Sequence, residues 1–354
     1  MKNNFALSVA HRAQSLITPL LAFTSALVVI AAIIALSSAS PVASLVRFFT
    51  APFSSSWYIG NILDMAALLI FAGIGSALAL RAGTFNLGGE SQIYASALVS
   101  AVILARFAPA EVVATTSFQT ALIWILALIA AIVTGSLLGF IPGLLRSRFA
   151  ISELLSSFLL SAALLPNIDY LVSGPFRDTE GNLLATPEIA EGFRMGTLLV
   201  PSRLNASFAV ALVLAALVWF FVSKTASGYR LRMTGIAPDF ARFAGFPVAR
   251  VTVIGMTASG AFHALTGFFA TTGTWYRCHE GMSAGMGWSA LACALIARGN
   301  PLAVIPAALI FAWLESASET AVISATVSFD PTPLLLAVVF LIISARHLSA
   351  RRPI

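Results

Sequence analysis

The feature that most constrains this chain is a series of long apolar segments that recurs along the whole sequence. About 20 apolar residues cross the hydrocarbon core of a bilayer as one α-helix. Because lipid offers the backbone no hydrogen-bond partner, such segments must be helical. The sequence therefore predicts an all-α integral membrane protein of about ten transmembrane helices. They are expected near 17–36, 58–80, 92–107, 118–141, 151–172, 205–222, 251–274, 282–297, 301–319 and 331–346.

Composition excludes the alternative of a soluble domain. Only 10% of the residues are charged and 59% are hydrophobic, whereas roughly 25% of the residues in soluble domains are charged. The run 17–36 is too long for the apolar part of a signal peptide, so we interpret it as an uncleaved first helix. The segment 42–53 is too short to span and contains Arg47 and Pro52, which favours a re-entrant or interfacial piece. No repeat or low-complexity tail divides the chain, so residues 1–354 are expected to form one transmembrane domain.

The basic residues predict the orientation. With ten spans and a cytoplasmic N-terminus, 14 of the 20 Lys and Arg residues fall in inner segments, as the positive-inside rule requires. Both termini are then cytoplasmic. The two largest loops are an outer one over 173–204 and an inner, basic one over 224–250. The net charge of +6 does not indicate nucleic acid, because the basic residues are spread over short loops.

Polar residues interrupt the apolar pattern most sharply between the second and third predicted helices, where residues 81–92 read RAGTFNLGGESQ. Glycine permits sharp turns and close helix approach. A carboxylate near the membrane needs a partner, and Arg81 is the nearest basic residue to Glu90 in the sequence. One interpretation is a tight helix connector with an Arg81–Glu90 ion pair. The other is a broken helix beside a transport pathway.

The inner loop contains a second distinctive segment. Pro238 favours the start of a helix, Asp239 suits its first turn, and Gly245 favours its end. Phe240 and Phe243 would share one face of that helix. We interpret it as a docking element for a cytosolic partner; the alternative is a helix that only lies on the membrane surface.

Other polar residues give weaker indications of function. Asp64, Glu153 and Glu315 lie in separate spans and would suit an ion relay in a secondary transporter, but Glu153 is close to Arg146 and Arg148 and favours structural pairing. His263, Cys278 and Cys293 are expected to be packing residues. No phosphate-binding loop, nucleophile elbow, metal-ligand cluster or catalytic constellation is recognisable. We therefore expect neither an enzyme nor a bound metal or cofactor, and ATP would have to bind another chain.

Three motifs in order resemble those of permease subunits of bacterial ABC importers for simple sugars and nucleosides. Residues 81–92 resemble the family's R-A-G-x-F-N-I-G-x-E-G-Q signature, with Ser91 in place of glycine. Residues 228–245 resemble its G-Y-x-x-R-x-x-G-x-x-P-x-A-A-x-x-x-G coupling segment, and residues 283–301 resemble its G-x-G-[FW] stretch. The likeness covers about 58–312. The segment from Glu315 to Asp330 matches no family pattern.

The resemblance implies a permease in the bacterial cytoplasmic membrane with several partners. These are an external substrate-binding lipoprotein, a second permease subunit (a copy or a paralogue), and cytosolic ABC ATPase subunits that bind ATP and Mg. It also implies roles for residues of two motifs. Those of the pathway motif are Gly83, Asn86, Gly88, Glu90 and Gln92. Those of the ATPase-coupling segment are Gly228, Tyr229, Arg230, Arg232, Gly235, Pro238, Ala241, Arg242 and Gly245.

The resemblance also indicates which class of solute to expect. Residues 171–178, LVSGPFRD, resemble the nucleoside-type branch, which includes spirochaete-type riboflavin permeases. A nucleoside or similar heterocycle is therefore expected. Riboflavin or a simple sugar moved by the same mechanism, and an ion-coupled secondary transporter, are the alternatives.

Overall fold

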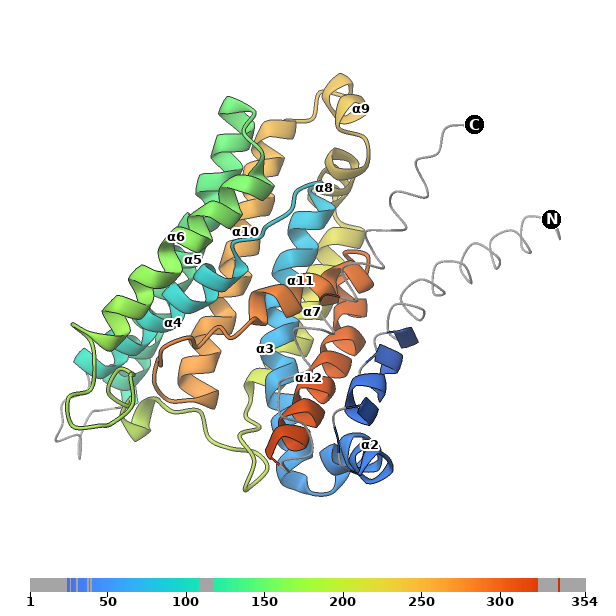
Figure 1. Ribbon diagram of the computed structural model, residues 1–354. Coiled ribbons are helices and arrows are strands. Elements are labelled where there is room, and N and C mark those ends of the chain that lie inside the picture. Colours follow the sequence, from blue (N-terminus) through green and yellow to red (C-terminus); the bar gives the residue numbers. More distant parts are fainter. Residues whose placement is uncertain are drawn as a thin grey trace. The chain divides into compact units, whose positions relative to one another are not determined.

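The computed structural model describes residues 40–107 and 117–323, parts of 24–38, and residue 337. Regular secondary structure in these residues is helical throughout (Figure 1). The elements are α2 (Pro41–Thr50), η1 (Ala51–Phe53), α3 (Ser56–Arg81), α4 (Gly89–Arg106), α5 (Ser117–Phe149), α6 (Glu153–Ser173), η2 (Glu191–Phe193), α7 (Ser207–Lys224), α8 (Ala226–Ile236), α9 (Pro238–Phe243), α10 (Val248–Phe269), the π-helical η3 (Ala270–Thr274), α11 (Met286–Ile296) and α12 (Pro301–Ile323).

Six helices in the described part are long and apolar enough to cross a membrane: Ser56–Arg81, Phe118–Phe149, Glu153–Ser173, Ser207–Lys224, Val248–Thr274 and Pro301–Thr320. They correspond to six of the expected segments. The expected span 92–107 lies in α4, and 282–297 shortens to the 11-residue α11. The expected helix at 331–346, apart from residue 337, and nearly half of that at 17–36 lie outside the described residues. The all-helical class is confirmed, and the count of ten stays a prediction.

The chain divides into two compact units, Ile59–Ala312 and a second made of Met1–Tyr58 with Trp313–Ile354. In the second unit, Phe48, Phe49 and Phe53 pack around Trp313, with ring centroids 5.8–6.5 Å from it. The 42–53 segment, expected to be re-entrant or interfacial, forms α2 and η1, which are too short to span a bilayer.

Close backbone packing builds the core of the Ile59–Ala312 unit. Gly135 and Gly139 lie one turn apart on α5 and face Met256 and Gly260 of α10; a Cβ at either α5 glycine would collide with a carbonyl oxygen of α10. Small residues let helix backbones approach and gain van der Waals contact, which is the main attraction between helices in lipid. Glycine at these positions therefore joins α5 firmly to α10.

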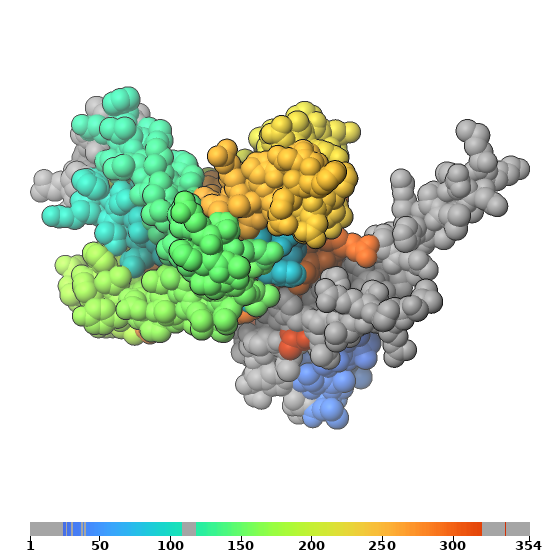
Figure 2. Space-filling view, turned by 90° about the horizontal axis from the view of Figure 1, so that it is seen from above, coloured from blue at the N-terminus to red at the C-terminus, as the bar shows by residue number. Residues whose placement is uncertain are grey.

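The 174–206 loop and the short helix α8 lie at opposite ends of α3 in this unit. Gly60, near the start of α3, contacts Ser202 of the 174–206 loop, and Gly83, just after its end, contacts Gly235 of α8. Figure 2 looks onto the end that carries α8 and α9, and these two helices form an uncovered yellow-to-orange patch there. The long loop and the short helices are thus separated by the length of a span.

Candidate functional site

The segment between α3 and α4 is held along its backbone by one face of α6. Three polar side chains of α6, spaced four residues apart, accept backbone N–H groups. Glu153 accepts from Phe85 at 3.2 Å, Ser157 from Leu87 at 3.0 Å, and Ser161 from Ser91 at 3.2 Å. Residues at i and i+4 share a helix face, so α6 holds both the non-helical backbone at Phe85 and Leu87 and the first turn of α4, where N–H groups lack partners within the helix.

Glu153 has a second partner, since Arg146 at the end of α5 forms an ion pair with it. Glu153 is buried, whereas the Arg146 side chain is 41% exposed. This confirms the expected structural pairing of Glu153. A buried carboxylate that accepts a backbone N–H and pairs with arginine is satisfied.

A buried polar network connects the 81–92 segment to its neighbouring helices. Asn86 donates from Nδ2 to Gln92 Oε1 at 2.8 Å and to Ser259 Oγ at 3.0 Å. His263 Nδ1 lies 2.8 Å from the same Gln92 oxygen, and Ser76 Oγ lies 3.3 Å from Nε2. Because Gln92 Oε1 can only accept, the proton belongs on Nδ1. The network joins the segment to α3 and α10, and it confirms His263 as a hydrogen-bonded packing residue.

The predicted Arg81–Glu90 ion pair is wrong. Glu90 instead accepts backbone N–H groups at the start of α11, from Gly287 at 2.7 Å, Trp288 at 3.2 Å and Gly285 at 3.3 Å. Arg81 donates from Nε to the carbonyl of Gly299 at 2.8 Å. The free N–H groups at a helix start carry partial positive charge and suit a buried carboxylate better than a distant guanidinium does.

A backbone contact links this segment to α8. A Cβ on Gly83 would lie 2.8 Å from the Cα of Gly235, and a Cβ on Gly235 would lie 2.8 Å from the backbone N of Gly83. Gly83 also has a φ of +75°, a conformation that only glycine adopts at low cost. No side chain fits between the two backbones, so α8 and the 81–92 segment are in direct backbone contact.

The coupling segment predicted from the sequence forms two short helices. Thr225 caps α8 by accepting from Gly228 N at 3.0 Å, and α9 begins at Pro238 as predicted. Most predicted contact residues are exposed, but Gly228 and Ala241 are buried, and Arg232 and Gly235 are half-buried. The exposed apolar side chains include Tyr229 at 46%, Phe240 at 55% and Phe243 at 93%. Such a surface suits contact with another protein or with lipid.

At the opposite end of α3, the buried carboxylate of Asp64 is held by two side chains. Asn205 Nδ2 and Thr274 Oγ1 each donate to it at 2.9 Å. Asp64 lies 17 residues before the end of α3, which is roughly 25 Å of helix. The structure therefore does not bring Asp64 together with Glu153 in a relay.

The 174–206 loop is bound to residues 272–281. Backbone bonds of 2.8 Å join Thr186 N to Cys278 O, Ile189 N to Tyr276 O and Met195 N to Thr272 O. Arg277 and Arg194 both donate to Glu188. Arg277 first, then Arg194, holds the pKa of the Glu188 carboxyl below its usual 4.5. The loop is therefore an ordered surface.

The described residues contain no group of three or more His, Cys, Asp or Glu side chains that could hold a metal ion. The polar side chains around the 81–92 segment form hydrogen bonds with backbone N–H groups and with one another. The arrangement fits a mechanical role, in which a non-helical connector is fixed between α6, α10, α11 and α8.

Comparison with known proteins gives one family and several relatives. The family model for the permease component of branched-chain amino acid transport systems matches residues 58–345. The probable riboflavin import permease protein RfuC of Treponema pallidum is 40% identical over 90% of this chain and 82% of that protein. The guanosine ABC transporter permease protein NupP of Bacillus subtilis is 27% identical over 96% of both. The nucleoside ABC transporter permease protein NupB of Lactococcus lactis is 24% identical over 86% of this chain and 84% of that protein. No solved structure shows significant similarity.

Proposed function

Because the chain belongs to the family of branched-chain amino acid transport system permease components, and is a permease component of an ABC importer, we propose that its solute is an aromatic heterocycle and that riboflavin is the first candidate. The observation that carries this choice is the 40% identity to the riboflavin permease over nine-tenths of the chain. The guanosine permease, at 27% identity, makes a nucleoside the second candidate.

We further propose that α8 and α9 form the coupling element on the cytoplasmic side, with both termini on that side. The distribution of basic residues supports this orientation, and so does the exposure of Phe240 and Phe243 on α9. Cytosolic ABC ATPase subunits, which bind ATP and Mg, would hold these helices. A second permease subunit and an external binding lipoprotein complete the importer, with the 174–206 loop as the surface that receives the lipoprotein.

The contacts of the 81–92 segment support a mechanism for coupling. When ATP closes the ATPase subunits, α8 moves and Gly235 acts on the backbone at Gly83. The segment passes this movement to α11 through Glu90 and to α10 through the Asn86–Gln92 network. A packed core switches between discrete arrangements, so the permease alternates between outward-facing and inward-facing states.

The substrate test uses a riboflavin auxotroph that expresses this chain together with its ATPase and binding-protein partners. We expect growth on low external riboflavin and uptake of labelled riboflavin that requires ATP hydrolysis. Excess unlabelled riboflavin should abolish this uptake, whereas excess guanosine or ribose should not. Competition by guanosine instead would favour the nucleoside candidate.

A separate control tests the transport class. Vesicles that contain this chain alone should not accumulate either compound when a proton or Na⁺ gradient is imposed. Accumulation under those conditions would contradict the importer mechanism itself rather than the choice of solute.

A further inference from the structure

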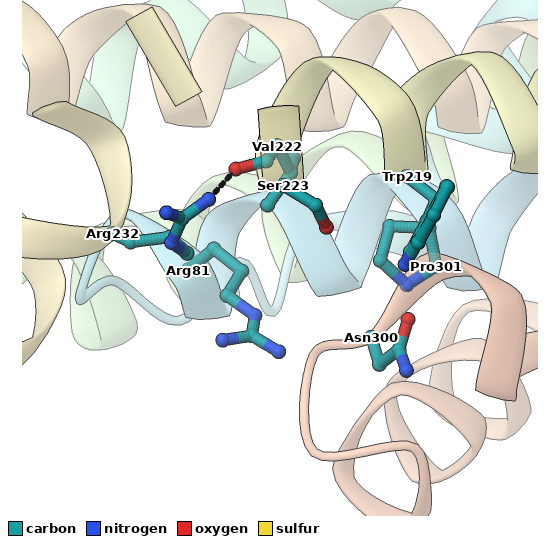
Figure 3. A pocket seen from close by; sticks show the side chains of 7 residues that line it. All are labelled: Arg81, Trp219, Val222, Ser223, Arg232, Asn300 and Pro301. Atoms are coloured by element: carbon teal, nitrogen blue, oxygen red, sulfur yellow. Dashed lines mark hydrogen bonds between the residues drawn. The ribbon is translucent and has the colours of Figure 1, made fainter. Parts of the chain in front are cut away.

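A pocket of about 170 Å³ lies where α3, α7, α8 and α12 meet in the Ile59–Ala312 unit. Figure 3 shows two arginine guanidinium groups at this pocket, with the side chains of Ser223 and Asn300 across from them. Its lining residues are Arg81, Trp219, Val222, Ser223, Arg232, Asn300 and Pro301. The lining is unusual because two positive charges share one small space.

No carboxylate of the described residues forms an ion pair with either arginine. Arg81 donates from Nε to Gly299 O, and Arg232 donates from Nη1 to Val222 O. A guanidinium has five N–H donors, so both groups keep donors for a further acceptor. Like charges in a half-buried site repel one another. An anion between the guanidiniums would remove that repulsion and accept the remaining N–H groups.

The position of the pocket indicates which anion it meets. Arg81 is the last residue of α3, and Lys224, next to the lining residue Ser223, is the last residue of α7; both helices are long enough to span a membrane. The Lys224 ammonium lies 6.0 Å from the centroid of the Trp219 ring. Tryptophan and basic residues at helix ends are typical of the membrane–water boundary. The pocket thus lies at the depth of lipid headgroups.

We propose that this pocket binds a phosphate-bearing anion, and that the headgroup of an anionic phospholipid supplies it. Arg81 and Arg232 bind the phosphate oxygens through paired N–H groups, an arrangement that arginine forms readily. Ser223 and Asn300 add neutral donors. Because Arg81 ends α3 and Arg232 belongs to α8, the bound anion joins the coupling element to the bundle. Basic pockets between membrane helices bind anionic headgroups in this way. The site is independent of the solute carried.

The test measures the thermal stability of the full-length chain in neutral detergent while one of three probes is added. The probes are dioleoyl-phosphatidylglycerol, dioleoyl-phosphatidylcholine and inorganic phosphate. We expect phosphatidylglycerol to raise the Tm saturably and phosphatidylcholine to leave it unchanged. Arg81→Gln and Arg232→Gln should each weaken binding of phosphatidylglycerol about tenfold, the effect of losing a charge-assisted hydrogen bond. A saturable shift with inorganic phosphate alone would support the same site with free phosphate as its source.

Two further variants separate binding from folding. Ser223→Asp places a carboxylate in the pocket, so we expect a raised Tm without lipid and no further shift with lipid. Arg148→Gln removes an exposed charge in the last turn of α5 and should leave lipid affinity unchanged. The proposal is overturned if no probe shifts the Tm of the unaltered chain, or if the pocket variants bind phosphatidylglycerol as tightly as Arg148→Gln does. It is also overturned if a shift appears only when the ATPase subunit is added, because a protein carboxylate would then be the occupant.

Discussion

Glu90 shows how a single buried side chain can fix the start of a helix far away in the sequence. Its carboxylate accepts N–H groups from Gly285, Gly287 and Trp288, almost 200 residues further along the chain. The first N–H groups of a helix lack partners within it, and α11 has no side-chain cap at Gly285. Glu90 supplies the missing acceptor and so joins the 81–92 segment to α11.

Replacing Glu90 with alanine should therefore destabilise the protein by about 1–3 kcal/mol, the cost of leaving buried donors unsatisfied. Thermal unfolding in detergent measures this. Glu280→Ala, at an exposed position, is the matched control and should have little effect. In a double-mutant cycle, Glu90→Gln and Arg81→Gln should be additive, because the two side chains have different partners. A large coupling energy would instead support an ion pair between Arg81 and Glu90.

The ion pairs of Glu188 lead us to expect that the stability of the 174–206 loop depends on pH. Because Arg277 and Arg194 lower the pKa of the folded-state carboxyl, the ionised form binds better, and its stabilisation is complete above the unfolded-state pKa of about 4.3. The stabilisation is lost as pH falls from there through the lowered pKa. The protection of the loop amides against hydrogen exchange, corrected for the intrinsic pH dependence of exchange, should therefore fall below about pH 4.3. Glu188→Gln should show lower protection already at pH 7 and lack this fall; equal profiles would contradict the assignment.

At the scale of elements, α6 has two different faces, one polar and buried and one apolar and exposed. Its buried face carries Glu153, Ser157 and Ser161, which hold the backbone of the 85–91 region. Much of the opposite face is apolar and exposed, with Leu155 at 53% and Leu159 at 54%, as expected for a helix that meets lipid or a second subunit. The spacing of the three polar residues at i, i+4 and i+8 is visible in the sequence and marks the face that packs inward.

The short helix α8 is where the proposed coupling of ATP hydrolysis to solute uptake can be tested. Gly235→Ala should impair uptake while ATP hydrolysis continues, because the new Cβ would collide with the carbonyl of Arg81 and separate α8 from the 81–92 segment. Alanine favours an isolated helix over glycine by about 1 kcal/mol, so lost helix propensity cannot explain a defect. The measurement is the ratio of solute moved to ATP hydrolysed in proteoliposomes. Ser227→Ala, at an exposed position of the same helix, should keep the normal ratio, and an equal ratio in both variants would refute the coupling contact.

At the scale of the whole molecule, the proposed orientation puts α9 and the 174–206 loop on opposite sides of the membrane. Single cysteines at Phe243, 93% exposed, and Leu198, 68% exposed, test this. Both native cysteines are buried, and burial also raises the pKa of the Cys278 thiol, so background labelling should be low. In intact cells an impermeant maleimide should label Leu198→Cys but not Phe243→Cys. The reverse pattern would place the coupling element outside and contradict the importer mechanism.

Three features could be predicted from the residues alone: the all-helical class, the positions of six long apolar helices and the short helix that begins at Pro238. These follow from local rules, because a lipid-exposed backbone must be helical and proline fixes the first turn. The motif resemblance indicated the permease family, which the family match over residues 58–345 confirms.

The groups that satisfy the buried polar side chains could not be predicted without the three-dimensional arrangement of the helices. Arg81 was the expected partner of Glu90 because it is close in sequence, but the actual partners are backbone N–H groups of α11. A backbone donor leaves no mark in the sequence, since every residue except proline has one. Which donors remain free depends on where a distant helix begins in space. For the same reason, the shared pocket of Arg81 and Arg232 became visible only when the ends of α3, α7 and α8 were placed together.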